Sequence, residues 1–307
     1  MLTCVAMENN LGAIINLLSC PDDGGPVRYA STELLCSACL RRFSIRGNNL
    51  AEMLPLRLSE AAAFANPAYH KGYLQAFEEV YRDDEAGLGW GAEETVPESW
   101  SRKRRRQVAA VEPLITEGAT ASESVCCDIA AGAGNYTLAY AHRFRFVFHC
   151  DLSVDNLNYA RRKARERGIK NVFFLRADYF ALPFQRSLDR ILCLDTLIRG
   201  ESHDAALLGG ILRSLAPTGI AVVDFHNWWH NPLRRIGLLP ENFVANRSYT
   251  EKKLRALLAG GGVSDFDVQP FVQEAEAVGW KARLLKTIIP PARFLVRIPA
   301  RRGADVG

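Results

Sequence analysis

The segment VCCDIAAGAGNYT at residues 125–137 constrains the fold more than any other part of the sequence. An apolar run leads to Asp128, Gly132 and Gly134 follow, and a helix is expected to start near Asn135. Glycines let a backbone approach a ligand closely, and a helix N-terminus presents unpaired N–H groups. The segment therefore predicts a buried strand, then a ligand-binding loop, then a helix.

A second predicted strand, RFVFHCD, ends at Asp151, 23 residues after Asp128. At this spacing an acid meets ribose hydroxyl groups in nucleotide-binding folds. A nicotinamide-type fingerprint would have glycine or alanine where Thr137 stands, so that pattern fails. The carboxylate of Asp128 would also repel a diphosphate, whereas it attracts an amino group or a sulfonium. The loop favours a cationic ligand, although both acids could simply form turns at strand ends.

Apolar runs alternate with helical segments from Ser124 onward, which is typical of βαβ units around a parallel sheet. Strands are predicted at 124–130, 145–150, 171–176, 189–194, 219–225, 263–269 and 293–298. A short amphipathic helix is predicted at 108–115, and further helices start near Asn135, Ser153, His203 and Thr250, the last of these residues being an N-cap.

The composition is that of an ordinary soluble globular protein, because 48% of the 307 residues are hydrophobic and 23% are charged. A formal net charge of +4 is too small to indicate nucleic-acid binding by itself. The first 18 residues have no basic n-region, and Glu8 and two asparagines interrupt their apolar run. Neither a signal peptide nor a membrane span is predicted, so a cytoplasmic protein is expected.

Residues 108–298 resemble the class I methyltransferases that use S-adenosylmethionine (SAM), particularly those of the quinone-biosynthesis type. The DIAAGAG stretch resembles the acidic glycine-rich loop of that family, with Ala130 where glycine is commoner. RADYFALPF at 176–184 resembles the loop in which Asp178 faces adenine, and CLDTLIRG at 193–200 resembles the loop that lines the methyl-transfer site. The resemblance implies an α/β, Rossmann-like sheet of seven strands with helices on both faces.

The resemblance also implies SAM as the cofactor, with contacts along the strand ends. These contacts are assigned to Asp128, Ala130, Gly132, Gly134, Asn135, Tyr136, Asp151, Leu152, Asn156, Asp178, Tyr179, Leu194 and Thr196. For Tyr136, Asn156 and Thr196 the alternative is a packing role without cofactor contact.

Cys20, Cys36 and Cys39 lie in the amino-terminal segment, and the last two have the spacing of a metal-binding knuckle. Asp23 would be the partner of Cys20, and a carboxylate is an acceptable zinc ligand. The segment up to about Pro55 resembles the small zinc-ribbon domain fused ahead of many methyltransferases, which implies a structural zinc site. Alternatively, the segment folds without metal on apolar packing. The predicted domains are a ribbon-like β domain at 1–58, a helical linker or cap at 59–118 and the methyltransferase domain at 119–300.

The acceptor side is predicted at the carboxyl edge of the sheet, where open α/β folds bind ligands. His226 follows the fifth predicted strand and is the candidate general base. The candidate substrate-binding residues are Tyr69, Tyr73, Arg199, Asn227 and Trp228. For each of these the alternative is packing.

The leading hypothesis is methyl transfer from SAM to an oxygen, nitrogen or carbon atom of a small molecule, such as a secondary metabolite. The alternative is an RNA base methyltransferase that docks through the basic run at 102–106. A SAM-binding protein with other chemistry, or with none, is a third hypothesis, because a fold does not identify a reaction. The acceptor, the methylated atom and the oligomeric state are not determined by the sequence.

Overall fold

The computed structural model describes residues 12, 14–47, 49–57, 98–197, 201–230, 238, 248–271 and 291–300, with backbone only at 98–104, 197, 201 and 202. Among the described helices none is long and apolar enough to cross a membrane.

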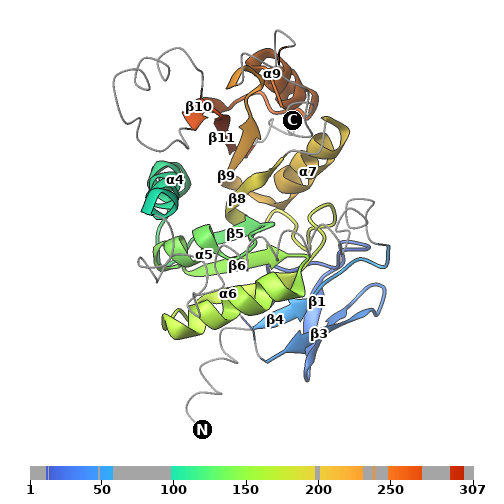
Figure 1. Cartoon of the computed structure of the whole chain (residues 1–307). Coiled ribbons are helices and arrows are strands. Elements are labelled where there is room, and N and C mark those ends of the chain that lie inside the picture. Colours follow the sequence, from blue (N-terminus) through green and yellow to red (C-terminus); the bar gives the residue numbers. More distant parts are fainter. Residues whose placement is uncertain are drawn as a thin grey trace.

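One mixed sheet connects the described parts of the chain (Figure 1). The strands are β1 (Val27–Ala30), β2 (Glu33–Cys36), β3 (Arg42–Arg46), β4 (Leu50–Glu52), β5 (Val125–Ile129), β6 (Phe146–Asp151), β7 (Val172–Arg176), β8 (Leu188–Leu197), β9 (Leu215–His226), β10 (Asp267–Phe271) and β11 (Arg293–Pro299). Their order across the sheet is β1-β2-β3-β4-β7-β6-β5-β8-β9-β11-β10.

The seven strands predicted from the sequence are all present as β5 to β11. Strands β7, β6, β5, β8 and β9 are parallel to one another, whereas β11 is antiparallel to β9 and pairs with β10. Every residue of β5 and β6 is buried, as expected for a parallel sheet covered on both faces. The carboxyl ends of the parallel strands therefore meet along one edge of the sheet.

The prediction of a seven-stranded sheet is wrong, because the sheet has 11 strands. Strand β4 pairs in parallel with β7, with Leu50 opposite Phe174 and Glu52 opposite Arg176. Strands β1 to β3 continue from β4 as antiparallel partners. The edge of β7 is thus occupied by the cysteine-bearing segment, which satisfies backbone groups that an edge strand would leave unpaired.

The cysteine-bearing segment also shares its hydrophobic core with the parallel sheet. Ile14, Leu18 and Phe43 lie in the same buried cluster as Phe173 and Phe184. This segment therefore packs as a continuation of the larger unit. The predicted boundaries at residues 58 and 118 stay predictions.

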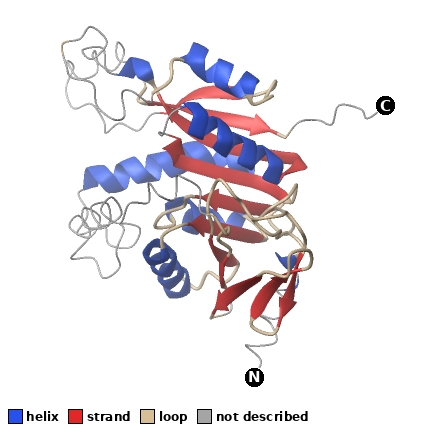
Figure 2. Ribbon diagram, turned by 90° about the vertical axis from the view of Figure 1, so that its right-hand side faces the viewer, coloured by secondary structure: helices blue, strands red, loops and turns tan. Residues whose placement is uncertain are grey.

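Helices cover both faces of the sheet (Figure 2). The helices are α4 (Glu98–Thr116), α5 (Asn135–Tyr140), α6 (Val154–Glu166), α7 (Glu201–Ser214) and α9 (Glu251–Gly260), with short 3-10 turns at Ala141–Arg143 and Trp228–His230. Buried residues of α4, α5 and α6 pack on one face, and those of α7 and α9 pack on the other. Thr250 caps α9 as predicted, since its side chain accepts a hydrogen bond from the Lys253 N–H.

Candidate functional site

The loop after β5 has the backbone conformation that its glycines suggested. Gly132 and Gly134 have φ values of 56° and 84°, in the left-handed region that favours glycine. A side chain at Gly134 would also lie 3.1 Å from Ala160 Cβ, whereas one at Gly132 would meet nothing within 4 Å. Gly134 thus serves close packing, while Gly132 borders open space in which a ligand can approach the backbone.

Ala130, which replaces a commoner glycine, has a φ of 53° and so occupies the same left-handed region. A non-glycine residue there is strained and is held by its surroundings. The neighbouring Ala131 N–H donates to the carbonyl oxygen of Cys150 at 3.0 Å, which ties the loop to the end of β6.

Asp151 lies at the end of β6 and faces this loop. Its Oδ2 accepts a hydrogen bond from the Gly132 N–H at 2.8 Å, and its Oδ1 accepts one from the Ser153 N–H at 2.8 Å. The Asn156 side chain donates to Oδ1 at 3.4 Å. The carboxylate therefore sits between the glycine loop and the start of α6, at the position where an acid can meet ribose hydroxyl groups.

Asp128 is buried beneath the loop. Its Oδ2 accepts hydrogen bonds from the Thr137 N–H at 3.0 Å and from the Thr137 hydroxyl at 2.7 Å. Burial raises the pKa of this carboxyl to about 7, against the lowering effect of the Thr137 hydrogen bonds. Within the described structure, Asp128 anchors the first turn of α5 to the end of β5.

His149 completes this buried network, and sequence reasoning missed it. Its Nδ1 lies 2.9 Å from the Thr137 hydroxyl oxygen, and the side chain is completely buried. Burial lowers the pKa of His149 to about 3, so the ring is neutral near pH 7. A lone histidine inside the apolar run FVFHCD carries no spacing signal, which is why the sequence did not reveal it.

Asp178 follows β7, the next strand in the sheet after β6. The Phe180 N–H donates to Asp178 Oδ1 at 3.0 Å, and the Ala177 N–H donates to the carbonyl oxygen of Asp151 at 3.2 Å. The two acids therefore lie at adjacent strand ends, and Asp178 is buried. Tyr179 packs against the ring of Phe180, with centroids 4.6 Å apart.

The remaining predicted cofactor residues belong to the same edge of the sheet. Asn135 and Tyr136 start α5, Leu152 and Asn156 lie at the β6–α6 junction, and Leu194 and Thr196 lie at the end of β8. The Thr196 hydroxyl donates to the carbonyl oxygen of Leu194 at 3.0 Å. The structure thus brings the predicted cofactor set together at four neighbouring strand ends.

A cluster of charged residues lies beside this set, at the ends of β8, β9 and β11. Arg293 Nη1 contacts both Asp195 Oδ1 and Asp224 Oδ2. Burial raises the pKa of Asp224 to about 6, against the lowering effect of Arg293. Burial by itself would lower the pKa of Arg293, but the two carboxylates raise it well above its ordinary value. Sequence reasoning did not single out Arg293 or Asp224.

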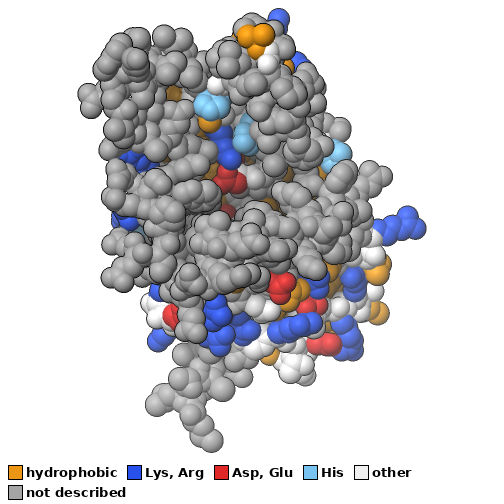
Figure 3. Space-filling view, viewed as in Figure 1, with side chains coloured by type: hydrophobic (Ala, Val, Ile, Leu, Met, Phe, Trp, Pro, Cys, Tyr) orange, Lys and Arg blue, Asp and Glu red, His pale blue; other side chains and the backbone are white. Residues whose placement is uncertain are grey.

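His226 borders this cluster, because Arg293 pairs with it across β9 and β11. Burial, followed by the charge of Arg293, lowers the pKa of His226 to about 4, so its imidazole is neutral near pH 7. Figure 3 shows histidine, basic and acidic side chains gathered on this face of the molecule.

The other predicted acceptor residues have different surroundings. The Asn227 side chain donates to the carbonyl oxygen of Pro291 at 2.9 Å and accepts from the Trp229 N–H at 2.9 Å, so it organises the turn after β9. Trp228 lies in that turn and is partly buried. Tyr69, Tyr73 and Arg199 lie outside the described residues.

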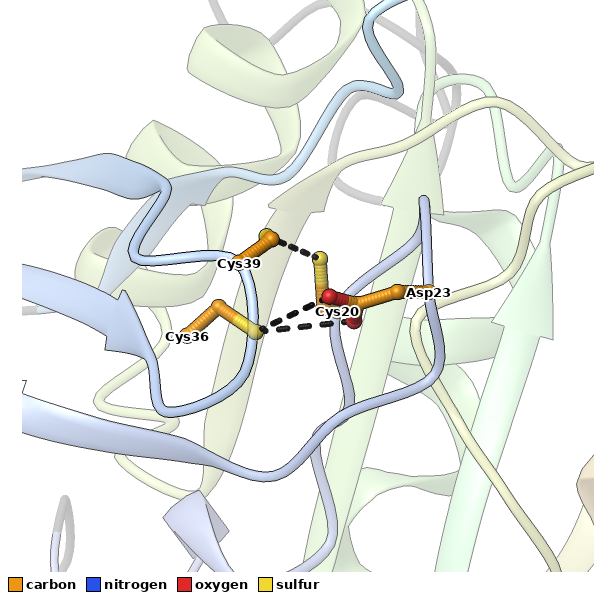
Figure 4. A group of neighbouring side chains, drawn as sticks. All are labelled: Cys20, Asp23, Cys36 and Cys39. Carbon is orange, nitrogen blue, oxygen red and sulfur yellow. Dashed lines mark hydrogen bonds between the residues drawn. The ribbon is translucent and has the colours of Figure 1, made fainter.

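The four predicted metal ligands converge around one point (Figure 4). One ligand atom each from Cys20, Asp23, Cys36 and Cys39 lies within 4.8 Å of all the others. The Cys20 and Cys39 sulfur atoms are 3.8 Å apart, and Cys36 Sγ lies 3.5 Å from Asp23 Oδ1. A tetrahedral zinc ion with zinc–sulfur distances of about 2.3 Å holds its ligand atoms roughly 3.8 Å apart. The donor set and the spacing both fit zinc.

One comparison with known protein families finds a match in this part of the chain. A family model described as a methyltransferase domain matches residues 126–219, which include the glycine loop, Asp151, Asp178 and the end of β8. No curated protein sequence matches the chain.

Similar folds occur among solved structures. The magnesium protoporphyrin IX methyltransferase from Synechocystis with bound SAM has a TM-score of 0.52 and 16% identity, over 80% of this chain and 99% of that chain. The geranyl diphosphate C-methyltransferase from Streptomyces coelicolor has a TM-score of 0.48 and 16% identity, over 66% of this chain and 80% of that chain. At such identities the first likeness shows a common fold. Residues 126–219 thus match a methyltransferase domain, and the chain shares its fold with the Synechocystis methyltransferase.

Proposed function

We propose that this enzyme transfers the methyl group of SAM to an oxygen, nitrogen or carbon atom of a small molecule. The observation that carries the proposal is the hydrogen bond of 2.8 Å from the Gly132 N–H to Asp151 Oδ2, beside open space over the glycine loop. An acid at the end of the second strand suits ribose hydroxyl groups, and glycine at position 132 lets a nucleoside approach the backbone closely.

The residues have distinct proposed roles. Asp151 accepts hydrogen bonds from the ribose hydroxyl groups, and Asp178 contacts the adenine. Asp128 belongs to the proposed cofactor-binding set, and it also supports the loop through its hydrogen bonds with Thr137. Bound SAM supplies an electrophilic methyl group, so the chain contributes mainly positioning of the acceptor and exclusion of water.

A small-molecule acceptor is proposed over RNA. The similarly folded magnesium protoporphyrin IX methyltransferase is named for such an acceptor, so the fold accommodates one. The basic run at 102–106 belongs to α4, and both Arg105 and Arg106 make interactions within the protein. RNA methylation remains the second candidate function because of that run. The quinone-biosynthesis subtype, a biosynthetic role and a cytoplasmic location are parts of the proposal that rest on the sequence.

A structural zinc ion is proposed for Cys20, Asp23, Cys36 and Cys39. Three thiol groups and a carboxylate form an acceptable tetrahedral set, and such closed sites contribute folding energy without taking part in catalysis. The Gly25 N–H donates to Asp23 Oδ1 at 2.7 Å and so orients the carboxylate toward the cysteines.

Transfer of labelled methyl groups tests the proposed function. The protein is incubated with methyl-labelled SAM and a cell extract that has been separated into RNA and small-molecule fractions, at low and moderate salt. Label in the small-molecule fraction is expected. Label in RNA that disappears as salt rises would favour the second candidate, since contacts to phosphate are salt-dependent. Binding of S-adenosylhomocysteine without any transfer would contradict both.

A further inference from the structure

We propose, on the basis of the proposed methyl transfer, that Asp195 binds the nitrogen of an amine acceptor and that Arg293 and Asp224 hold its carboxylate in position. The acceptor class would accordingly be primary or secondary amines. Three features of the described residues support this assignment: the place of Asp195 in the sheet, its backbone conformation and the charge around it.

Asp195 lies next to the glycine loop. Strand β8 pairs with β5 on one side and with β9 on the other. Asp128 is opposite Leu192, so Asp195 lies three residues farther along, at the same edge from which the loop departs. Ligands of open α/β sheets bind at this edge. Asp195 therefore stands between the proposed SAM site and the end of β9.

The backbone at Asp195 is held in an unusual conformation. Its φ is 62°, and it lies within an irregularity of β8, between the regular pairs formed by Cys193 and Leu197. The Asp195 N–H donates to Asp224 Oδ1 at 2.8 Å, while its carboxylate contacts Arg293. Strand irregularities beside active sites redirect side chains, and strained residues persist where the surroundings fix them. The hydrogen bond to Asp224 holds the backbone of Asp195, and the contact with Arg293 holds its carboxylate.

The charge of the cluster favours an acceptor that donates hydrogen bonds. Asp195 and Asp224 carry two negative charges against one positive charge on Arg293, and His226 is neutral near pH 7. The side chain of Asp224 is 2% exposed, whereas that of Asp195 is 38% exposed. Asp195 is thus the carboxylate that a ligand can reach. An anionic acceptor would be repelled, and an N–H group would be bound.

An amine is favoured over an alcohol as the acceptor because a hydroxyl group must lose its proton to a base before it can attack the methyl group. An alcohol needs a base to become a nucleophile, and His226, with a pKa lowered to about 4, is too weak a base for an ordinary hydroxyl group. The nitrogen of a neutral amine is nucleophilic enough to react without a base in the transfer step. A bound ammonium ion first gives one proton to Asp195 or to water, which frees the nitrogen lone pair. That lone pair forms the N–C bond, the C–S bond breaks with its electrons passing to sulfur, and the N-methylammonium product carries the positive charge away.

The test compares Asp195→Asn with the unchanged protein. Asparagine tolerates a left-handed backbone and keeps a similar shape, so it removes the charge with little effect on folding. Asp267→Asn is the matched control, because Asp267 is an exposed aspartate that pairs with Arg297 at 3.7 Å, at the opposite end of β11. A small-molecule extract is first divided on a cation exchanger into basic and unretained fractions. Each fraction then reacts with methyl-deuterated SAM, and products are read by mass spectrometry.

Deuterated products are expected in the basic fraction. The yield should fall at least tenfold in Asp195→Asn and stay unchanged in Asp267→Asn, while S-adenosylhomocysteine affinity stays the same in all three proteins. Products confined to the unretained fraction, or an undiminished yield in Asp195→Asn, would overturn the amine proposal and leave methyl transfer intact. Absence of products from every fraction would instead count against the proposed function on which it rests.

Discussion

At the scale of single residues, Asp151 has the clearest expected effect on cofactor binding. Its carboxylate accepts hydrogen bonds from Gly132 and Ser153 and faces the proposed ribose site. Asp151→Ala should weaken S-adenosylhomocysteine binding at least tenfold, or about 1.4 kcal/mol, because hydrogen bonds to a charged acceptor are lost. Calorimetry measures this affinity. Asp155→Ala, which removes an exposed carboxylate from the first turn of α6, should bind as the unchanged protein does.

Asp151→Asn guards against a folding defect, since it keeps the shape and one acceptor oxygen. It should also bind more weakly than the unchanged protein when both are measured well below their melting temperatures, although one of the two backbone N–H groups loses its acceptor. Full affinity in both Asp151 variants would refute the assignment of this carboxylate to the nucleoside.

Asp128 predicts a pH dependence of stability. Its pKa is raised from 3.8 to about 7 in the folded chain, so the folded state binds the proton more tightly than the unfolded state does. The contribution of Asp128 is therefore fully present below about pH 4 and is lost as pH rises through about 7. The free energy of unfolding of the unchanged protein, minus that of Asp128→Asn, should fall across this range by at most about 1.4 kcal/mol per pH unit.

Chemical denaturation of both proteins at several pH values measures this difference. The comparison with Asp128→Asn is needed because the titration of His149 changes the free energy of unfolding with pH in the opposite direction. Its pKa is lowered to about 3, so its stabilising contribution is lost as pH falls below about 6.5. A difference that stays constant between pH 4 and 7 would show that Asp128 titrates normally.

At the scale of elements, the metal cluster is joined to the loop that carries Asp178. The Ser19 N–H, one residue before Cys20, donates to the carbonyl oxygen of Pro183 at 2.9 Å, and Leu18 forms a bridge with Phe184. The Met53 N–H donates to the carbonyl oxygen of Arg176 at 2.8 Å, at the end of β7. The cysteine-bearing segment thus holds both ends of the 177–184 loop.

Removal of metal should therefore weaken cofactor binding as well as stability. Dialysis against a chelator, or Cys36→Ser, should lower the melting temperature and reduce S-adenosylhomocysteine affinity several-fold, because metal binding contributes to folding. Restored zinc should recover affinity in the chelated protein and fail to do so in the variant. Less than one equivalent of zinc in protein purified without chelator would contradict the metal site, and unchanged affinity after its removal would contradict the coupling.

At the scale of the whole molecule, the sheet extends past the strands of the methyltransferase fold. Its 11 strands run from β1, in the cysteine-bearing segment, to the paired strands β11 and β10 (Figure 1). One buried cluster spans Ile14 near one end of the described chain and Val296 near the other. The proposed cofactor site lies in the middle of this sheet, between the metal cluster on one side and the Asp195 cluster on the other.

The sequence alone determined the features that depend on neighbouring residues. The apolar runs of β5 to β9, the glycine loop, the capping Thr250 and the strand-end acid Asp151 all follow from local periodicity and spacing. The four candidate metal ligands also came from spacing, and the structure brings them together. In each case the residues that carry the signal lie close together in the sequence.

Only the tertiary structure decided the features that depend on distant pairing. Strand β4 pairs with β7, which lies more than 120 residues later in the chain. Every strand edge offers the same backbone hydrogen-bonding groups, so the sequence does not show which two strands will pair. Arg293 reaches Asp224 and Asp195 because β11 returns antiparallel to β9. The packing of the whole chain likewise decided that Asp128 is buried and that Asp195 is partly exposed to solvent.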